Sequence, residues 1–133
     1  MRACGMVIAI ISLLLGAPSF AQSDVGAEAP SITPSELMAR RQSDTAPVVI
    51  DVRTPSEYAA GHIPGSLNIA FDQVADRISK VEAPHGVVLY CMLGPRARKG
   101  EAALLAAGYT SVLHLEGGLA AWQENGFPVE TKQ

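Results

Sequence analysis

Cys91 is the residue in this sequence best suited to nucleophilic chemistry, and Gly94 and Arg96 follow it closely. An apolar run over 86–90 predicts a buried strand that ends at Cys91, and residues 96–107 have a helical composition. So short a connection between a strand and a helix must curl, and Gly94 permits backbone conformations that other residues avoid. The curl turns amide N–H groups inward and the helix start adds partial positive charge, so both favour a thiolate. We therefore expect Cys91 to be a nucleophile.

Three basic residues lie near this cysteine in an otherwise acidic chain, which has a net charge of −3. Arg96, Arg98 and Lys99 would give the rim of the loop a local positive field, which predicts that a small anion binds there. The alternative is that Cys91 is an inert buried cysteine, because free cysteine is often buried in protein cores.

The composition limits the class of protein. The 133 residues suffice for one domain, and 48 % apolar with 17 % charged residues is typical of a packed core. An acidic chain with few aromatic residues does not fit nucleic-acid binding. Two cysteines are too few for a disulfide scaffold or a four-thiolate zinc site, and three scattered histidines predict no metal site.

The first 21 residues have the pattern of a secretory signal peptide. Arg2 precedes a short apolar run over 6–15, and small residues surround a cleavage site expected after Ala21. An uncleaved anchor is the alternative, but the run falls short of the roughly 20 apolar residues that span a bilayer. We expect a periplasmic or secreted protein with no membrane span after cleavage. Removal of Cys4 would leave Cys91 alone, either inert or kept for its reactivity.

The remaining chain divides into a flexible lead-in over 22–31 and one domain over 32–130. Apolar runs at 48–52, 86–90 and 112–115, with a weaker one at 66–70, alternate with helical segments. This alternation predicts an α/β domain with a parallel sheet covered on both faces and ligands at the carboxyl ends of its strands. The tetrapeptide Thr-Pro-Ser-Glu occurs at 33–36 and 54–57, and each copy predicts a capped helix start.

Three segments in order resemble the rhodanese family and together span Ile32 to Val129. They are Val49-Ile50-Asp51-Val52-Arg53 with Glu57-Tyr58 and Gly61-His62-Ile63-Pro64-Gly65-Ser66-Leu67-Asn68-Ile69; Cys91-Met92-Leu93-Gly94-Pro95-Arg96 with Ala97; and Leu115-Glu116-Gly117-Gly118 with Ala121-Trp122 and Gly126-Phe127-Pro128-Val129. The resemblance implies a three-layer fold with a central parallel sheet of four to five strands and helices on both faces.

The resemblance also implies a sulfurtransferase that needs no cofactor. In the family the loop cysteine, here Cys91, attacks the outer sulfur of a small anionic donor such as thiosulfate, so that sulfite leaves and a persulfide remains. An acceptor such as cyanide or a thiol then takes the sulfur. By position, the substrate-binding residues are those that follow the cysteine: Met92, Leu93, Gly94, Pro95 and Arg96.

Two other functions stay open: a phosphatase or oxyanion reductase of the same fold, and a sulfur-relay module. Phosphatases of this fold carry five residues between cysteine and arginine, whereas four separate Cys91 from Arg96, which favours sulfur over phosphate or another oxyanion. The apolar pair Met92 and Leu93 departs from the more polar loops of many thiosulfate enzymes. That pair favours a sulfur-relay module that exchanges persulfide with a protein partner.

Residues outside the loop have supporting roles in this account. Asp51 ends a strand near the expected site, so it and Arg53 are candidates to support the loop. We expect Asp51 and Arg53 to face opposite ways, which leaves Arg53 to pair with Glu57. His62 lies in a Gly- and Pro-rich turn, where it either satisfies backbone groups or acts as a general base toward Cys91.

Overall fold

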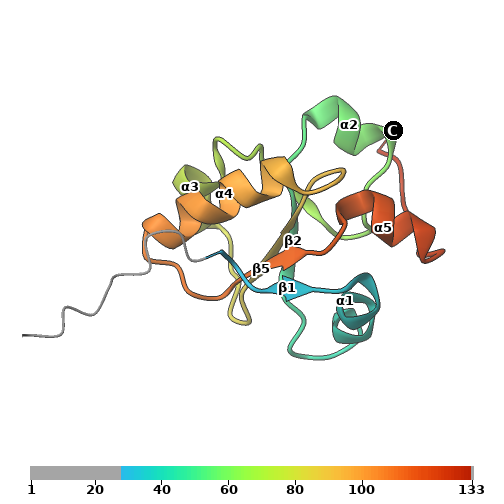
Figure 1. The fold of residues 1–133 in the computed structure, drawn as a ribbon, viewed down its shortest axis with the longest axis horizontal. Coiled ribbons are helices and arrows are strands. Elements are labelled where there is room, and N and C mark those ends of the chain that lie inside the picture. The colour runs from blue at the N-terminus through green and yellow to red at the C-terminus, as the bar shows by residue number, and fades with distance from the viewer. Residues whose placement is uncertain (1–27, 133) are drawn as a thin grey trace, which may run out of the picture.

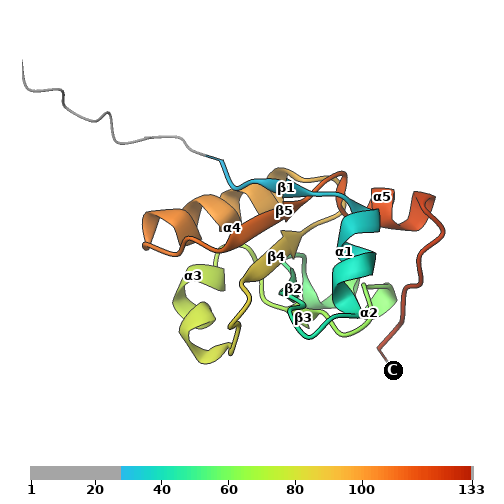
Figure 2. The same cartoon turned by 90° about the horizontal axis from the view of Figure 1, so that it is seen from below.

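A computed structural model describes residues 28–132 of the chain. The expected signal peptide over 1–21 and the lead-in residues 22–27 lie outside the described residues. Five parallel strands form one sheet in the order β1-β5-β4-β2-β3. Figure 1 shows β1, β5 and β2 of this sheet, and Figure 2 labels all its strands. The elements in chain order are β1 (Ser31–Ile32), α1 (Pro34–Arg41), β2 (Val48–Asp51), α2 (Pro55–Ala60), β3 (Leu67–Asn68), α3 (Val74–Arg77), the 3₁₀ turn η1 (Ile78–Lys80), β4 (Val87–Tyr90), α4 (Pro95–Ala106), β5 (Val112–Leu115) and α5 (Gly118–Glu124).

Helices cover both faces of the sheet, which confirms the predicted three-layer α/β fold. Figure 2 shows α3 and α4 on one side of the strands and α1 with α5 on the other. The first face buries Val74 of α3 and Leu104 of α4 against strand residues such as Leu89. The second face buries Leu37 of α1 and Trp122 of α5. Apolar side chains are thus removed from water on both faces, as fully buried parallel strands require.

Both Thr-Pro-Ser-Glu segments start helices, as the sequence predicts. Thr33 caps α1 and Thr54 caps α2, and each threonine hydroxyl accepts a hydrogen bond from the backbone N–H of the glutamate three residues later. Each glutamate carboxylate accepts in return from the N–H of its threonine. The repeat is therefore a capping device used twice.

Some boundaries differ from those predicted. Ala29 is buried and Ser31 lies in β1, so the lead-in ends before residue 31 because this segment completes the edge of the sheet beside β5. β3 has only two residues, fewer than the predicted run at 66–70, and α3 and η1 follow it along the chain. Between residues 28 and 132, no helix has the length and apolar character needed to cross a bilayer.

The sheet brings two loops together at one edge. Asp51, at the end of β2, lies opposite Tyr90, at the end of β4. Since both strands run in the same direction, the segments that follow them leave the sheet on the same side. Those segments begin with Val52 and Cys91, so the Asp51–Arg53 turn adjoins the cysteine loop.

Candidate active site

The loop between β4 and α4 holds the cysteine sulfur against a backbone amide. Cys91 is only 1 % exposed and packs on the α4 face of the sheet. Gly94 has φ +147°, a conformation that side-chain-bearing residues rarely adopt, and its N–H donates to Cys91 Sγ over 3.0 Å. Pro95 then opens α4. The loop curls as predicted, and one amide contacts the sulfur directly.

The start of α5 fixes the outer side of this loop. The N–H of Leu119 donates to the Cys91 carbonyl over 2.9 Å, and that of Ala120 donates to the Met92 carbonyl over 3.1 Å. In a trans peptide the C=O and N–H point in opposite directions. The amides that follow these two carbonyls, those of Met92 and Leu93, are therefore turned away from α5.

Gly118 makes this contact between α5 and the loop sterically feasible. A Cβ on Gly118 would lie 2.6 Å from both the Cys91 and the Met92 carbonyl oxygens, and its φ is +62°. Only glycine fits so close an approach. The sequence analysis gave the Gly117-Gly118 pair as part of the family resemblance but missed that Gly118 supports the cysteine loop.

Arg96 lies at the mouth of the loop in a two-point ion pair with Glu57 of α2. Arg96 Nη1 and Nη2 donate to the two Glu57 carboxylate oxygens over 2.7 and 3.0 Å. The hydrogen bond from Arg96 is the main cause that lowers the pKa of Glu57 to about 2. The same bond is the main cause that raises the pKa of Arg96. The expected pairing of Glu57 with Arg53 is wrong, because α2 presents Glu57 to α4 instead.

Arg53 pairs with Asp51 inside the adjoining turn. Arg53 Nη2 lies 2.6 Å from Asp51 Oδ2, and both side chains are almost fully buried. The expectation that the two face opposite ways is wrong, because the backbone N–H and the guanidinium of Arg53 both donate to the Asp51 carboxylate in the bend after β2. Burial alone would lower the pKa of Arg53, but the hydrogen bond and charge of Asp51 raise it above its ordinary value. Arg53 Nη2 also donates to the Gly61 carbonyl, so the pair ties β2 to the turn after α2.

The comparison with known protein families covers most of the described domain. A family model described as the rhodanese-like domain matches residues 33–125. The chain belongs to the rhodanese family.

Relatives of this rhodanese domain include proteins named as sulfurtransferases. A sulfurtransferase of Allochromatium vinosum is 38 % identical over 96 residues, 71 % of this chain and 90 % of the relative. The thiosulfate sulfurtransferase GlpE of Pseudomonas entomophila is 32 % identical over 102 residues, 77 % of this chain and 91 % of GlpE. These relatives support a rhodanese-type sulfurtransferase.

A solved structure shares the fold. The rhodanese-like domain of the Anabaena protein Alr3790 superimposes with a TM-score of 0.70 at 30 % identity, covering 77 % of this chain and 80 % of that one. The likeness confirms the rhodanese-like α/β fold with its central parallel sheet.

The imidazole of His62 in this rhodanese domain is stacked, and both of its nitrogens are hydrogen-bonded. Its ring stacks on Tyr58 at 3.6 Å between centroids, Nδ1 lies 2.6 Å from the Tyr58 carbonyl, and Nε2 lies 3.2 Å from Glu130. Both ring nitrogens therefore have partners, one in α2 and the other in the C-terminal segment. This agrees with the backbone-satisfying role and leaves no free nitrogen to act as a base toward Cys91.

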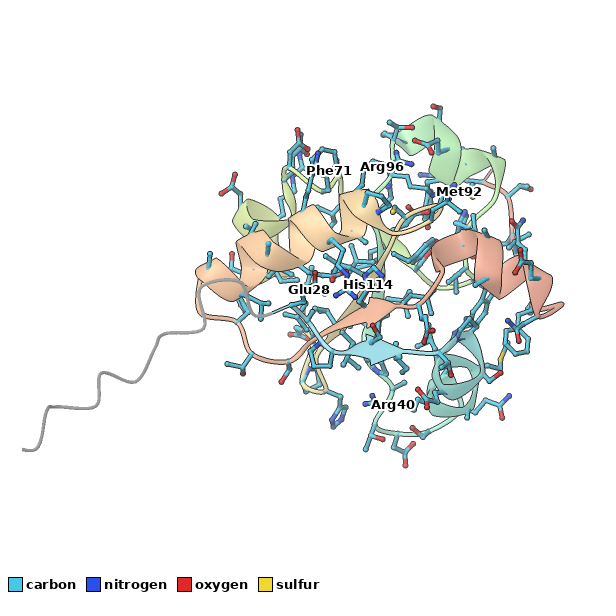
Figure 3. The ribbon with its side chains drawn as sticks, viewed as in Figure 1. Glu28, Arg40, Phe71, Met92, Arg96 and His114 are labelled. Atoms are coloured by element: carbon cyan, nitrogen blue, oxygen red, sulfur yellow. The ribbon has the colours of Figure 1, made fainter. Side chains whose placement is uncertain are left out.

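The predicted positive rim is reduced to Arg96. Arg98 turns toward the N-terminal segment, where its Nη1 donates to the Ala29 carbonyl over 2.8 Å. Lys99 lies over the Phe71 ring, 5.7 Å from its centroid. The expectation of three cations at the rim is wrong, because Arg98 is rotated by about 200° from Arg96 around the axis of α4 and Lys99 is drawn to the Phe71 ring. Figure 3 shows Met92 and Arg96 at the end of the molecule that carries α2.

A buried polar pair that the sequence analysis missed lies under the loop. His114 of β5 and Glu101 of α4 are 6 % and 1 % exposed, and His114 Nδ1 lies 2.6 Å from Glu101 Oε2. The sequence does contain a signal that Glu101 is buried, because it lies between Ala97 and Leu104 at the spacing of a buried helix face. His114 is buried because β5 lies between β1 and β4 and is not an edge strand.

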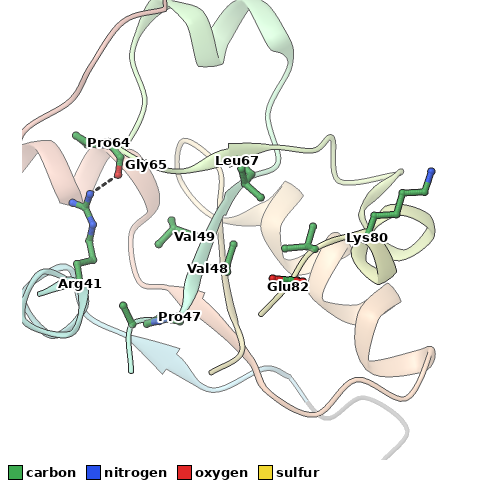
Figure 4. A pocket seen from close by; sticks show the side chains of 11 residues that line it. Arg41, Pro47, Val48, Val49, Pro64, Gly65, Leu67, Lys80 and Glu82 are labelled. Carbon is green, nitrogen blue, oxygen red and sulfur yellow. Dashed lines mark hydrogen bonds between the residues drawn. The ribbon is translucent and has the colours of Figure 1, made fainter. Parts of the chain in front are cut away.

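A hollow of about 510 Å³ lies away from Cys91. It surrounds the amino end of β2, opposite the end that carries Asp51, and Arg41 reaches across it to the Pro64 carbonyl (Figure 4). Its lining contains neither Cys91 nor any residue of the cysteine loop. Within residues 28–132, no three His, Cys, Asp or Glu side chains gather as metal ligands do. The candidate chemistry therefore rests on the cysteine loop.

Proposed function

We propose that this protein is a sulfurtransferase that carries a sulfane sulfur on Cys91. The observation that supports this most is the position of Sγ at the carboxyl end of β4, where it accepts the Gly94 N–H over 3.0 Å. Such a bond stabilises negative charge on sulfur, and the thiolate is the reactive form of cysteine. The four residues between Cys91 and Arg96 give the loop the length that favours a sulfur donor over phosphate.

The reaction is a two-step transfer with a covalent intermediate. The Cys91 thiolate attacks the outer sulfur of thiosulfate or a similar donor and forms a new S–S bond. The S–S bond of the donor breaks and its electron pair leaves on sulfite. Cyanide or a thiolate then attacks the outer sulfur of the Cys91 persulfide, and the electron pair of that S–S bond returns to the Cys91 thiolate. No metal or organic cofactor takes part in either step.

Arg96 and the loop amides bind the donor in this proposal. A guanidinium carries five N–H donors, and Glu57 takes two of those of Arg96. Because the Arg96 side chain is 33 % exposed, its other N–H groups can meet an anion that enters from solvent. The backbone N–H groups of Met92, Leu93, Gly94 and Arg96 would hold the donor oxygens and later the persulfide, whereas Pro95 has no N–H to donate. Asp51 and Arg53 support the loop from the adjoining turn and do not touch the sulfur.

Steady-state kinetics over several sulfur donors tests the proposal. We expect the wild type to transfer sulfur to cyanide and Cys91→Ala to have no activity above background. A conservative change at an exposed position, His85→Asn, serves as the control and should leave the rate unchanged. Equal rates for the wild type and Cys91→Ala would overturn the proposal.

A sulfur relay with a protein partner is the second candidate, and the loop surface favours it. Met92 and Leu93 are 37 % and 68 % exposed, and they flank the reactive position. Exposed apolar side chains at a reactive site are typical of contacts with another protein. In that case Cys91 would accept sulfur readily from a persulfide donor and only poorly from thiosulfate. Comparing the loading of Cys91 by thiosulfate and by a polysulfide separates the two functions.

We further propose that the protein is exported and cleaved after Ala21. The support is the sequence pattern of the first 21 residues alone. N-terminal sequencing of the protein recovered from the periplasm or the medium should start at Gln22, and recovery of the intact chain in the membrane fraction would contradict this.

A further inference from the structure

We propose that His114, held by Glu101, is a positioning residue that keeps the Gly94 N–H directed at Cys91 Sγ. This inference rests on the proposed function, because it concerns the same sulfur, but it assigns a role to two residues outside the cysteine loop. Neither residue follows from the rhodanese motifs in the sequence.

The sheet register places His114 beside Cys91. His114 of β5 lies opposite Leu89 of β4, and Cys91 follows Leu89 by two residues. Side chains two residues apart along a strand point to the same face, so Cys91 and His114 both lie on the face that α4 covers. They are diagonal neighbours on adjacent strands.

Gly94 lies between the sulfur and the imidazole. Its N–H donates to Cys91 Sγ, and a Cβ on Gly94 would lie 3.5 Å from His114 Nε2 and 3.6 Å from Cε1. The ring therefore packs directly under the glycine whose amide faces the sulfur. Gly94 has no side chain of its own to fix its conformation, so the loop depends on the surface beneath it.

Glu101 fixes the ring that supports the loop. Its Oε2 lies 2.6 Å from His114 Nδ1, and its Oε1 accepts from Arg98 Nη1 over 3.3 Å. Both carboxylate oxygens of Glu101 are therefore hydrogen-bonded. Arg98 is itself held in place, because its Nη1 also donates to the Ala29 carbonyl. A carboxylate bound to one imidazole nitrogen sets the orientation of the whole ring. The order of support thus runs from Arg98 through Glu101 and His114 to Gly94.

Two variants separate this role from general stability. His114→Asn keeps a hydrogen-bond donor near Glu101 but removes the ring atoms beside Gly94, and Glu101→Gln keeps the shape of the carboxylate but removes its charge. The matched controls are His85→Asn and Glu124→Gln, both at exposed positions. The probe is iodoacetamide, which alkylates the Cys91 thiolate whether or not the protein transfers sulfur.

We expect His114→Asn to slow alkylation of Cys91 about tenfold, and Glu101→Gln about threefold, because a hydrogen bond to the sulfur is weakened. Hydrogen exchange at the Gly94 amide should accelerate in both variants, while exchange at Val88 and Leu89 stays at the wild-type rate. Both control variants should behave like the wild type.

Two results would overturn the inference. One is an unchanged alkylation rate together with unchanged exchange at Gly94. The other is equal acceleration of exchange at Gly94 and throughout β4, because the pair would then only stabilise the fold. If His114→Asn does not fold, Glu101→Gln decides by the same two readouts. A wild type that alkylates readily but transfers no sulfur would refute the proposed function and leave this inference standing.

Discussion

Gly118→Ala is the perturbation that most sharply tests how α5 supports the cysteine loop. The new methyl carbon would lie 2.6 Å from two carbonyl oxygens, those of Cys91 and Met92. Ordinary van der Waals contact begins near 3.4 Å, so the start of α5 or the loop must move by roughly 0.8 Å. That movement strains or breaks the bonds from the Leu119 and Ala120 amides to the same carbonyls.

Gly126→Ala provides a matched control for this perturbation. Gly126 has φ +74°, close to the +62° of Gly118, and a Cβ there would meet nothing within 4 Å. Both variants therefore carry the same left-handed backbone penalty, about 1–2 kcal/mol. Only Gly118→Ala adds the clash, about 1–3 kcal/mol, and weakens two hydrogen bonds worth about 1 kcal/mol each.

We expect Gly118→Ala to lower the free energy of unfolding by about 3 kcal/mol more than Gly126→Ala does, as the sum of the clash and the weakened bonds. Urea denaturation of both variants measures this difference. Alkylation of Cys91 by iodoacetamide should also slow in Gly118→Ala alone. Equal destabilisation of the two variants, or an unchanged alkylation rate in Gly118→Ala, would refute the reasoning.

Three further predictions concern the polar groups around the loop. Glu57→Gln should lower the free energy of unfolding by no more than about 1 kcal/mol, since the ion pair with Arg96 is partly exposed. Because the pKa of Glu57 is lowered to about 2, this stabilisation is present above pH 4.5 and is lost as the pH falls toward 2, where urea curves of variant and wild type should converge. Asp51→Asn should cost about 3–5 kcal/mol in the same assay, because Arg53 would stay buried without its counter-charge; a loss below 1 kcal/mol would contradict the structure. Tyr90→Phe removes the hydroxyl that accepts from the Ile63 N–H over 3.0 Å, and calorimetry should show a free energy of unfolding lower by about 1–3 kcal/mol; unchanged stability would contradict this role of the hydroxyl.

Local sequence patterns predicted most of the fold and the position of Cys91 in it. Both Thr-Pro-Ser-Glu segments cap helices because the capping box needs only residues within one turn. Cys91 lies at the end of a buried strand because an apolar run and a short loop fix that position. These features depend on residues that are close together in the sequence, so local sequence patterns are enough to predict them.

The contacts that complete the site join segments that are distant in the sequence. The sequence analysis either did not predict these contacts or predicted the wrong partner. Glu57 pairs with Arg96 across 39 residues, and the start of α5 holds the loop. Which of several arginines a glutamate meets depends on how α2 and α4 pack, and local patterns do not encode that. The Asp51–Arg53 error has a different cause, since the bend after β2 brings the Arg53 guanidinium back to the Asp51 carboxylate.

Mass spectrometry of Cys91 after exposure to thiosulfate tests the central claim most directly. The protein should gain one sulfur atom on the peptide that contains Cys91, and cyanide should remove it with the release of thiocyanate. Cys91→Ala should gain nothing under the same conditions. Sulfur transfer from thiosulfate to cyanide without any added sulfur on Cys91 would contradict the account.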